Sequence, residues 1–122
     1  MSDPEALFAA QHRLAPARRS GFDRAARLAA LDRLRAAVLA HRAEIEAALQ
    51  ADFGKHPTET LLTEIVPVLQ EISHARRHLR GWMRVRRVWP SLTMLGASGR
   101  IVPQPKGVAL IIAPWNFPLN LA

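Results

Sequence analysis

A polar amide follows directly after a continuous apolar run near the end of the chain. Residues 107–113, Gly-Val-Ala-Leu-Ile-Ile-Ala, have the length and the β-branched content of a strand that is buried on both faces. The turn 114–118, Pro-Trp-Asn-Phe-Pro, comes next and contains Asn116. In open α/β sheets, ligands bind beyond the carboxyl ends of the strands, so Asn116 stands where a ligand-binding side chain would lie. Spacing alone favours a simpler interpretation, in which Asn116 hydrogen-bonds its own backbone and stabilises the turn.

Other patterns that could bind metal or phosphate are weaker. His74 and His78 stand four residues apart and share a helix face, an arrangement that zinc can use. Ala75 occupies the place that glutamate has in the HExxH motif, so two exposed histidines are favoured and no metal site is predicted. Residues 96–99, Gly-Ala-Ser-Gly, lack the GK[ST] ending of a phosphate-binding loop and favour a hairpin turn. The 122 residues contain no cysteine, which excludes a disulfide, a thiolate ligand or a cysteine nucleophile among them.

The charge of the chain is uneven. Seventeen basic and ten acidic residues give a net charge of +7, and residues 62–122 hold eight of the basic but two of the acidic ones. A small basic helical module that binds nucleic acid, or serves another interaction, is therefore the alternative function. Four arginines share one helix face opposite an apolar face, which is typical of a solvated amphipathic helix: Arg76, Arg80, Arg84 and Arg87. Aromatic residues for base stacking are too few, so we predict no nucleic-acid partner.

Helices must position these groups, because helical periodicity covers most of the first 82 residues. The expected helices are Asp3–Leu14, Asp23–His41, Ala43–Asp52 and Thr58–Trp82. Asp3 can cap the first helix, and residues 16–21 are expected to break it. Gly54 and Pro57 stop the third helix, and Pro67 predicts a kink or a fresh start in the fourth.

The apolar positions of these helices predict one packed core. It should contain Leu28, Leu31, Leu34, Val38, Ile45, Leu49, Leu61, Leu62, Ile65, Leu69, Ile72 and Trp82. From Arg86 onward, prolines and glycines indicate short strands and turns. A doubly buried parallel strand needs other strands beside it, and no other segment of the chain supplies one. We therefore expect a fragment of a larger domain, in which residues 86–122 are poorly anchored.

Three regions follow from this pattern: a helical part over 1–85, irregular strands and turns over 86–106, and the first strand and turn of a truncated α/β domain over 107–122. The expected fragment is thus mostly α-helical, with a few short strands and one buried parallel-type strand at its C-terminal end. No apolar run approaches the roughly 20 residues that span a bilayer. The acidic N-terminus does not resemble a secretory signal, so a cytoplasmic location is predicted.

Several ordered motifs together resemble the aldehyde dehydrogenase superfamily. Residues 114–118 match its P-W-N-[FY]-P motif, and residues 100–108 match the R-x-x-x-x-P-x-G-V lead-in. Upstream, residues 51–55, 59–60 and 74–83 are similar to the class 3 and coniferyl-aldehyde branches. The resemblance covers nearly the whole chain, which corresponds to the N-terminal quarter or so of a family member.

The resemblance implies a Rossmann-related α/β fold in the parent family, and oxidation of a small-molecule aldehyde to a carboxylic acid with NAD or NADP. It gives Asn116 the role of donating its side-chain N–H to the oxyanion of the thiohemiacetal. It also places Ala113, Pro114 and Trp115, with Asn116, at the cofactor site on the nicotinamide side. A cytoplasmic homodimer is expected by analogy. The family's catalytic cysteine and glutamate lie downstream of this motif, so the fragment alone is predicted to be inactive.

Overall fold

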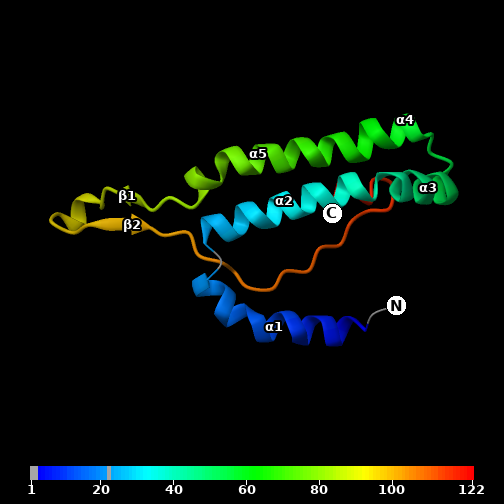
Figure 1. Ribbon diagram of the computed structural model, residues 1–122. Coiled ribbons are helices and arrows are strands. Elements are labelled where there is room, and N and C mark those ends of the chain that lie inside the picture. Colours follow the sequence, from blue (N-terminus) through cyan, green and yellow to red (C-terminus); the bar gives the residue numbers. More distant parts are fainter. Residues whose placement is uncertain (1–2, 22) are drawn as a thin grey trace. The chain divides into compact units, whose positions relative to one another are not determined.

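The computed structural model describes residues 3–21 and 23–122 and is mainly helical (Figure 1). Its helices are α1 (Pro4–Gly21), α2 (Arg24–Ala40), α3 (Arg42–Phe53), α4 (Pro57–Thr60) and α5 (Val66–Trp82). One π-helical turn, Leu61–Ile65, joins α4 to α5. The strands are β1 (Arg86–Val88) and β2 (Gly99–Ile101), with a short 3₁₀ turn, Leu92–Met94, between them. Within the described residues, no helix combines the length and apolar character that crossing a bilayer requires.

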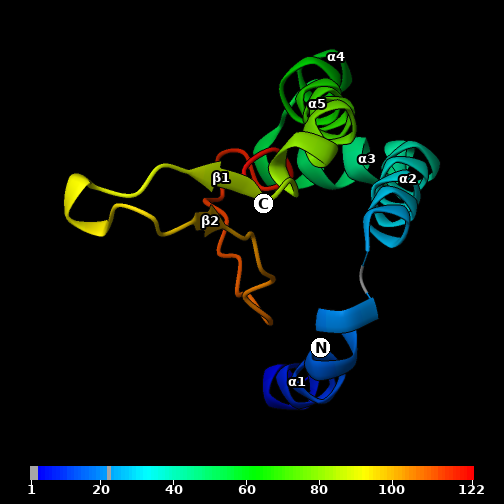
Figure 2. The same cartoon turned by 90° about the vertical axis from the view of Figure 1, so that its left-hand side faces the viewer.

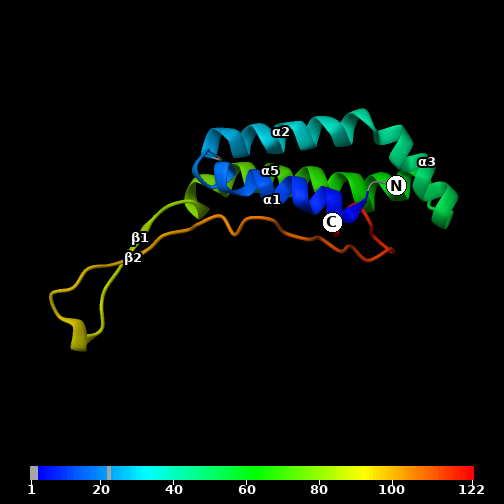
Figure 3. The same ribbon diagram turned by 90° about the horizontal axis from the view of Figure 1, so that it is seen from below.

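The chain divides into two compact units, which are described separately. One unit contains the residues up to Arg24 together with 78–108. The other contains residues 25–77 and 109–122, and it holds the candidate site. In the second unit, α2 runs beside the first part of α5 (Figures 1 and 3). Arg76 of α5 forms an ion pair with Asp32 of α2.

Helix α1 is longer than predicted. The backbone N–H of Glu5 donates to Oδ1 of Asp3 at 3.0 Å, so the predicted cap is confirmed. The predicted break at 16–21 is wrong, because the helix continues through Pro16 to Gly21. Proline removes one helical hydrogen bond, the one to the carbonyl of His12. His12 is exposed, so water can satisfy that carbonyl and the interruption is tolerated.

The predicted core is confirmed in its centre. Val38, Leu49, Ile65 and Ile72 are all buried, and Leu28, Leu31, Ile45, Leu61 and Leu69 are partly buried. The prediction is wrong for three residues: Leu34, Leu62 and Trp82 are each half exposed or more. Helical periodicity assigns a residue to a face but does not show how wide the covered face is.

A π-turn separates the two halves of the predicted helix at Thr58–Trp82. The N–H of Val66 donates to the carbonyl of Leu61, five residues earlier, and Pro67 follows at once. Proline has no N–H, so the carbonyl of Thr63 loses the donor that an ordinary helix would provide. The expected irregularity at Pro67 is therefore confirmed, and it leaves one carbonyl free for another partner.

Thr60, just before the π-turn, is completely buried, and its hydroxyl makes no hydrogen bond to any described residue. A buried hydroxyl without a partner costs free energy, and valine has the same branched shape without the oxygen. We expect Thr60→Val to raise the free energy of unfolding by about 1 kcal/mol. Urea denaturation followed by circular dichroism measures this. The exposed Thr58→Val is the control, and an equal gain there would contradict the assignment.

The strands β1 and β2 form an antiparallel hairpin (Figure 2). Arg86 faces Ile101, and Val88 faces Gly99. A Cβ atom at Gly99 would lie 2.7 Å from Cγ2 of Val88, so any larger residue at this strand position would force the Val88 side chain to shift. The connection between the strands includes residues 96–98, as predicted for a hairpin.

The apolar run 107–113 is the clearest difference from the expected elements. It forms neither helix nor strand, whereas a buried strand was predicted there. Leu110 is 85% exposed and Ile112 is 84% exposed. A strand needs a neighbouring strand for its backbone groups, and the two strands that the structure describes pair with each other. The segment has the composition of a central strand but no sheet to join.

This exposed segment predicts aggregation, because it is uncharged, β-prone and unpaired. We expect Ile111→Lys to raise the concentration at which the purified chain begins to aggregate, measured by light scattering. Leu92→Lys adds the same charge outside the segment, at a site that is 85% exposed against 67% for Ile111. Equal gains from the two substitutions would mean that net charge, rather than the segment, controls aggregation.

Candidate functional site

The site is built around Lys55, the second residue after the end of α3. Gly54 has a φ of 66°, and its N–H donates to the carbonyl of Gln50 at 2.9 Å. This left-handed residue is the predicted helix stop, and it turns the chain sharply. Pro57 then begins α4, where the side chain of His56 accepts the N–H of Thr58 at 3.2 Å. The short connection sets Lys55 against the π-turn.

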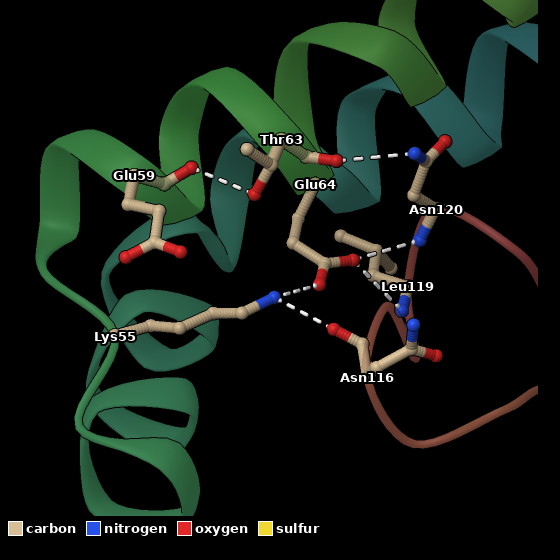
Figure 4. Close-up of polar contacts among 7 residues, drawn as sticks. All are labelled: Lys55, Glu59, Thr63, Glu64, Asn116, Leu119 and Asn120. Atoms are coloured by element: carbon tan, nitrogen blue, oxygen red, sulfur yellow. Dashed lines mark hydrogen bonds and ion pairs between the residues drawn. The ribbon is translucent and has the colours of Figure 1, made fainter.

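Lys55 forms an ion pair with Glu64 inside the helical unit (Figure 4). Nζ of Lys55 lies 2.7 Å from Oε1 of Glu64. The Glu64 side chain is fully buried and that of Lys55 is 12% exposed. A buried carboxylate is costly unless it is paired and its oxygens accept hydrogen bonds. The surroundings of Glu64 meet this requirement.

The second oxygen of Glu64 accepts two backbone N–H groups from the end of the chain. The N–H of Asn120 donates to Oε2 at 2.9 Å, and that of Leu119 donates at 3.2 Å. The N–H of Leu121 bonds to the carbonyl of Phe117, so residues 117–121 form one helical turn. Glu64 therefore caps this turn from a distant part of the sequence, with charge-assisted hydrogen bonds.

Asn120 fills the gap that Pro67 leaves. Its side-chain Nδ2 donates to the carbonyl of Thr63 at 3.1 Å (Figure 4). That carbonyl is the one that would have bonded to an N–H at position 67 in an ordinary helix. The Thr63 hydroxyl donates in turn to the carbonyl of Glu59 at 2.8 Å. The irregular helix thus creates an acceptor that binds the C-terminal turn.

Lys55 holds the residue that immediately precedes that turn. Nζ donates to the backbone carbonyl of Asn116 at 2.9 Å, and it lies 4.3 Å from the centre of the Phe117 ring, within cation–π range. Residues 116–120 are therefore bound at both ends to the 55–64 region. The expectation that all of 86–122 is poorly anchored is wrong for these residues.

The structure places the predicted site residues on one edge of this anchored turn. Ala113 is half-buried, Pro114 and Asn116 are exposed, and Trp115 is 82% exposed. An open hollow of about 400 Å³ is lined by Asp52, Phe53, Trp115 and Pro118. Among the described residues, the side-chain amide of Asn116 makes no hydrogen bond. The simpler interpretation of the sequence requires the Asn116 side chain to hydrogen-bond its own backbone, and the structure shows no such bond in the described part of the chain.

Sequence analysis gave no role to Lys55, Thr63, Glu64 or Asn120. Two signals were available. Glu64 is an acidic residue among the apolar positions of a helix, and the 62–122 half contains just two acidic residues. Lys55 is one of two lysines in a chain whose other fifteen basic residues are arginine. Neither signal shows which distant backbone atoms these side chains contact. As for a metal, no cluster of three candidate ligands occurs among the residues described.

Comparisons with known proteins point to one family. The model of the aldehyde dehydrogenase family matches residues 4–122. A probable coniferyl aldehyde dehydrogenase of Pseudomonas aeruginosa is 37% identical over 119 residues, which cover 97% of this chain and 25% of that protein. One of Caulobacter vibrioides is 41% identical over 88 residues, covering 69% and 18%. The aldehyde dehydrogenase family 3 protein comG of Dictyostelium discoideum is 42% identical over 78 residues, covering 64% and 17%.

A solved structure, the substrate-bound state of Staphylococcus aureus AldH, superposes with a TM-score of 0.87 at 30% identity. The match covers 99% of this chain and 26% of that one. The fold is therefore that of a mostly helical part of an α/β enzyme, as predicted. The chain belongs to the aldehyde dehydrogenase family, and its relatives include the class 3 and coniferyl-aldehyde branches that the motifs indicated. It spans between 17% and 25% of the length of the curated relatives named here.

Proposed function

We propose that these residues form the N-terminal part of an NAD(P)-dependent aldehyde dehydrogenase that oxidises an aldehyde to a carboxylic acid. The observation that carries the proposal is the state of Asn116. Its backbone is fixed by Lys55, while its side-chain amide is exposed and makes no hydrogen bond to a described residue. A fixed backbone with a free donor suits a group that must bind a developing charge.

Asn116 would act while the carbonyl carbon of the aldehyde is attacked. Addition of a cysteine thiolate turns the carbonyl oxygen into an oxyanion, and Nδ2 of Asn116 would donate an N–H to it. NAD or NADP, when bound, accepts the hydride that leaves this carbon. Ala113, Pro114 and Trp115 are uncharged, and Pro114 and Trp115 are exposed, which fits a surface beside a flat nicotinamide ring. These residues would orient the ring and exclude water.

The 122 residues should have no dehydrogenase activity by themselves. They contain no cysteine, so they cannot supply the thiolate that the reaction requires. A cytoplasmic location and a homodimer remain part of the proposal by family analogy. The alternative, a basic module that binds nucleic acid, is less well supported, because Arg76 of the basic helix face is already paired with Asp32.

A chimaera tests the proposal. Residues 1–122 would replace the matching N-terminal quarter of the Pseudomonas aeruginosa relative. We expect the soluble, folded chimaera to reduce NAD or NADP with coniferyl aldehyde, measured as absorbance of the reduced nicotinamide. The relative without its N-terminal quarter and the 122-residue chain alone should both be inactive. A folded chimaera without turnover, together with salt-dependent nucleic-acid binding by the short chain, would favour the alternative.

A further inference from the structure

We propose that Lys55 and Glu64 are positioning residues, which set the conformation of the 116–120 turn and thereby the placement of the Asn116 amide. The expected effect on catalysis rests on the proposed function, because it depends on the role of Asn116 as a donor to the oxyanion. Its structural content, a buried ion pair that holds a distant turn, can be tested in the 122-residue chain itself.

The geometry is that of a two-ended clamp, which we define as Lys55 and Glu64 with their bonds to 116–120. Lys55 binds the start of the turn through the Asn116 carbonyl at 2.9 Å. Glu64 binds its end through the N–H groups of Leu119 and Asn120. The 2.7 Å ion pair between the two side chains joins both ends (Figure 4). The separation of the two ends of the turn therefore depends on this pair.

The clamp uses the backbone of Asn116 and leaves its side chain available. Were Lys55 to bond the side-chain oxygen, the whole amide would be held against Lys55 and could not turn toward a ligand. Because Nζ contacts the main-chain carbonyl instead, the Cα–Cβ bond of Asn116 is aimed while the amide stays exposed. A donor to an oxyanion needs this arrangement, since small errors in placement lower its effect.

Burial makes the clamp specific for particular backbone groups of the 116–120 turn. Glu64 is fully buried and Lys55 nearly so, which means that water cannot easily replace a lost partner. Apolar contacts alone would hold the turn against the helices but would tolerate sliding. Hydrogen bonds from a fixed carboxylate specify which N–H groups meet it.

The first experiment measures amide hydrogen exchange by NMR in the 122-residue chain. Glu64→Gln removes the charge but keeps the shape, so we expect exchange at Leu119 and Asn120 to accelerate by about tenfold or more. Ile72, in the helical core, reports global opening and should change much less. Glu59→Gln is the matched control, since Glu59 is exposed and lies one helical turn away.

Lys55→Met is the second variant, with Lys106→Met as its control. Methionine fills nearly the same volume as lysine without its charge. We expect faster exchange at Leu119 and Asn120 in Lys55→Met and no change in Lys106→Met. If the two amides exchange at wild-type rates in both clamp variants, the inference is overturned. Should the variants unfold, the unsubstituted chain still decides: unprotected Leu119 and Asn120 amides there would also overturn it.

The chimaera then separates the clamp from the proposed function. We expect Lys55→Met to lower kcat by about tenfold with little change in the KM for the aldehyde, because positioning acts on the transition state. In an Asn116→Ala background, Lys55→Met should lower kcat much less, since its effect passes through Asn116. Independent, multiplicative losses would overturn the inference. Normal turnover of Asn116→Ala would contradict the proposed oxyanion role alone, and the exchange results would still report on the clamp.

Discussion

In the complete chimaeric enzyme, Asn116→Ala is expected to lower turnover by about 10²–10³-fold, the usual effect of removing one preorganised donor to an oxyanion. The loss should fall on formation of the thiohemiacetal oxyanion and on the hydride transfer that starts from it, because the oxygen gains negative charge in the first stage and still carries it on entering the second. Cofactor affinity should change less. Asn116→Asp should be at least as harmful, since it would place a carboxylate beside the oxyanion. Turnover per folded active site is the measurement.

The matched control is Asn120→Ala in the same turn. Its amide bonds to the carbonyl of Thr63 and is therefore structural. We expect this variant to lower the free energy of unfolding by about 1 kcal/mol, and to lower turnover per folded site far less than Asn116→Ala does. Near-normal turnover with a lowered melting temperature in Asn116→Ala would reject the oxyanion role. The two asparagines would then be equivalent turn residues.

Ile65→Ala is expected to cost about 2–5 kcal/mol in the free energy of unfolding of the 122-residue chain. Ile65 is 1% exposed at the end of the π-turn, so truncation leaves a cavity in the centre of the helical unit. A domain of this size has a total stability of about 5–15 kcal/mol, so this loss is a large fraction of the free energy of unfolding. Urea denaturation with circular dichroism detection gives the value.

Leu62→Ala tests whether the π-turn makes Leu62 exposed and Ile65 buried. Leu62 belongs to the same turn but is 61% exposed, so we expect a change within about 0.5 kcal/mol. Sequence periodicity placed Leu62 and Ile65 together in the core. Equal losses at the two positions would favour that regular-helix arrangement over the one described.

The helices were largely predictable because their signals are local. Asp3 caps α1, Gly54 ends α3 and Pro67 marks the irregularity between α4 and α5, each through its own backbone chemistry. Periodic apolar residues likewise identified Val38 and Ile72 as buried. Local signals gave a wrong helix end where solvent can satisfy a backbone group. Pro16 remains inside α1 because the carbonyl that it frees lies at an exposed position.

Strand formation at 107–113 shows a different kind of failure. Composition correctly identifies a β-prone apolar segment, but a strand exists only when a neighbour accepts its backbone hydrogen bonds. The described chain pairs β1 with β2 and leaves this segment unpaired and exposed. The β-propensity of a segment can be read from its own residues, whereas its pairing depends on a neighbouring strand elsewhere in the structure.

The sequence by itself determined the family, the order of the helices and the position of Asn116 in its motif, because these depend on residue type and short spacing. Only the tertiary structure revealed the clamp. Lys55 and Asn116 are 61 residues apart, and Glu64 is 56 residues from Asn120. Contacts between a side chain and a distant backbone atom leave no periodic signal, since every residue except proline carries the same N–H and every residue the same C=O. Burial and the π-turn determine which backbone N–H and C=O groups hydrogen-bond to these side chains.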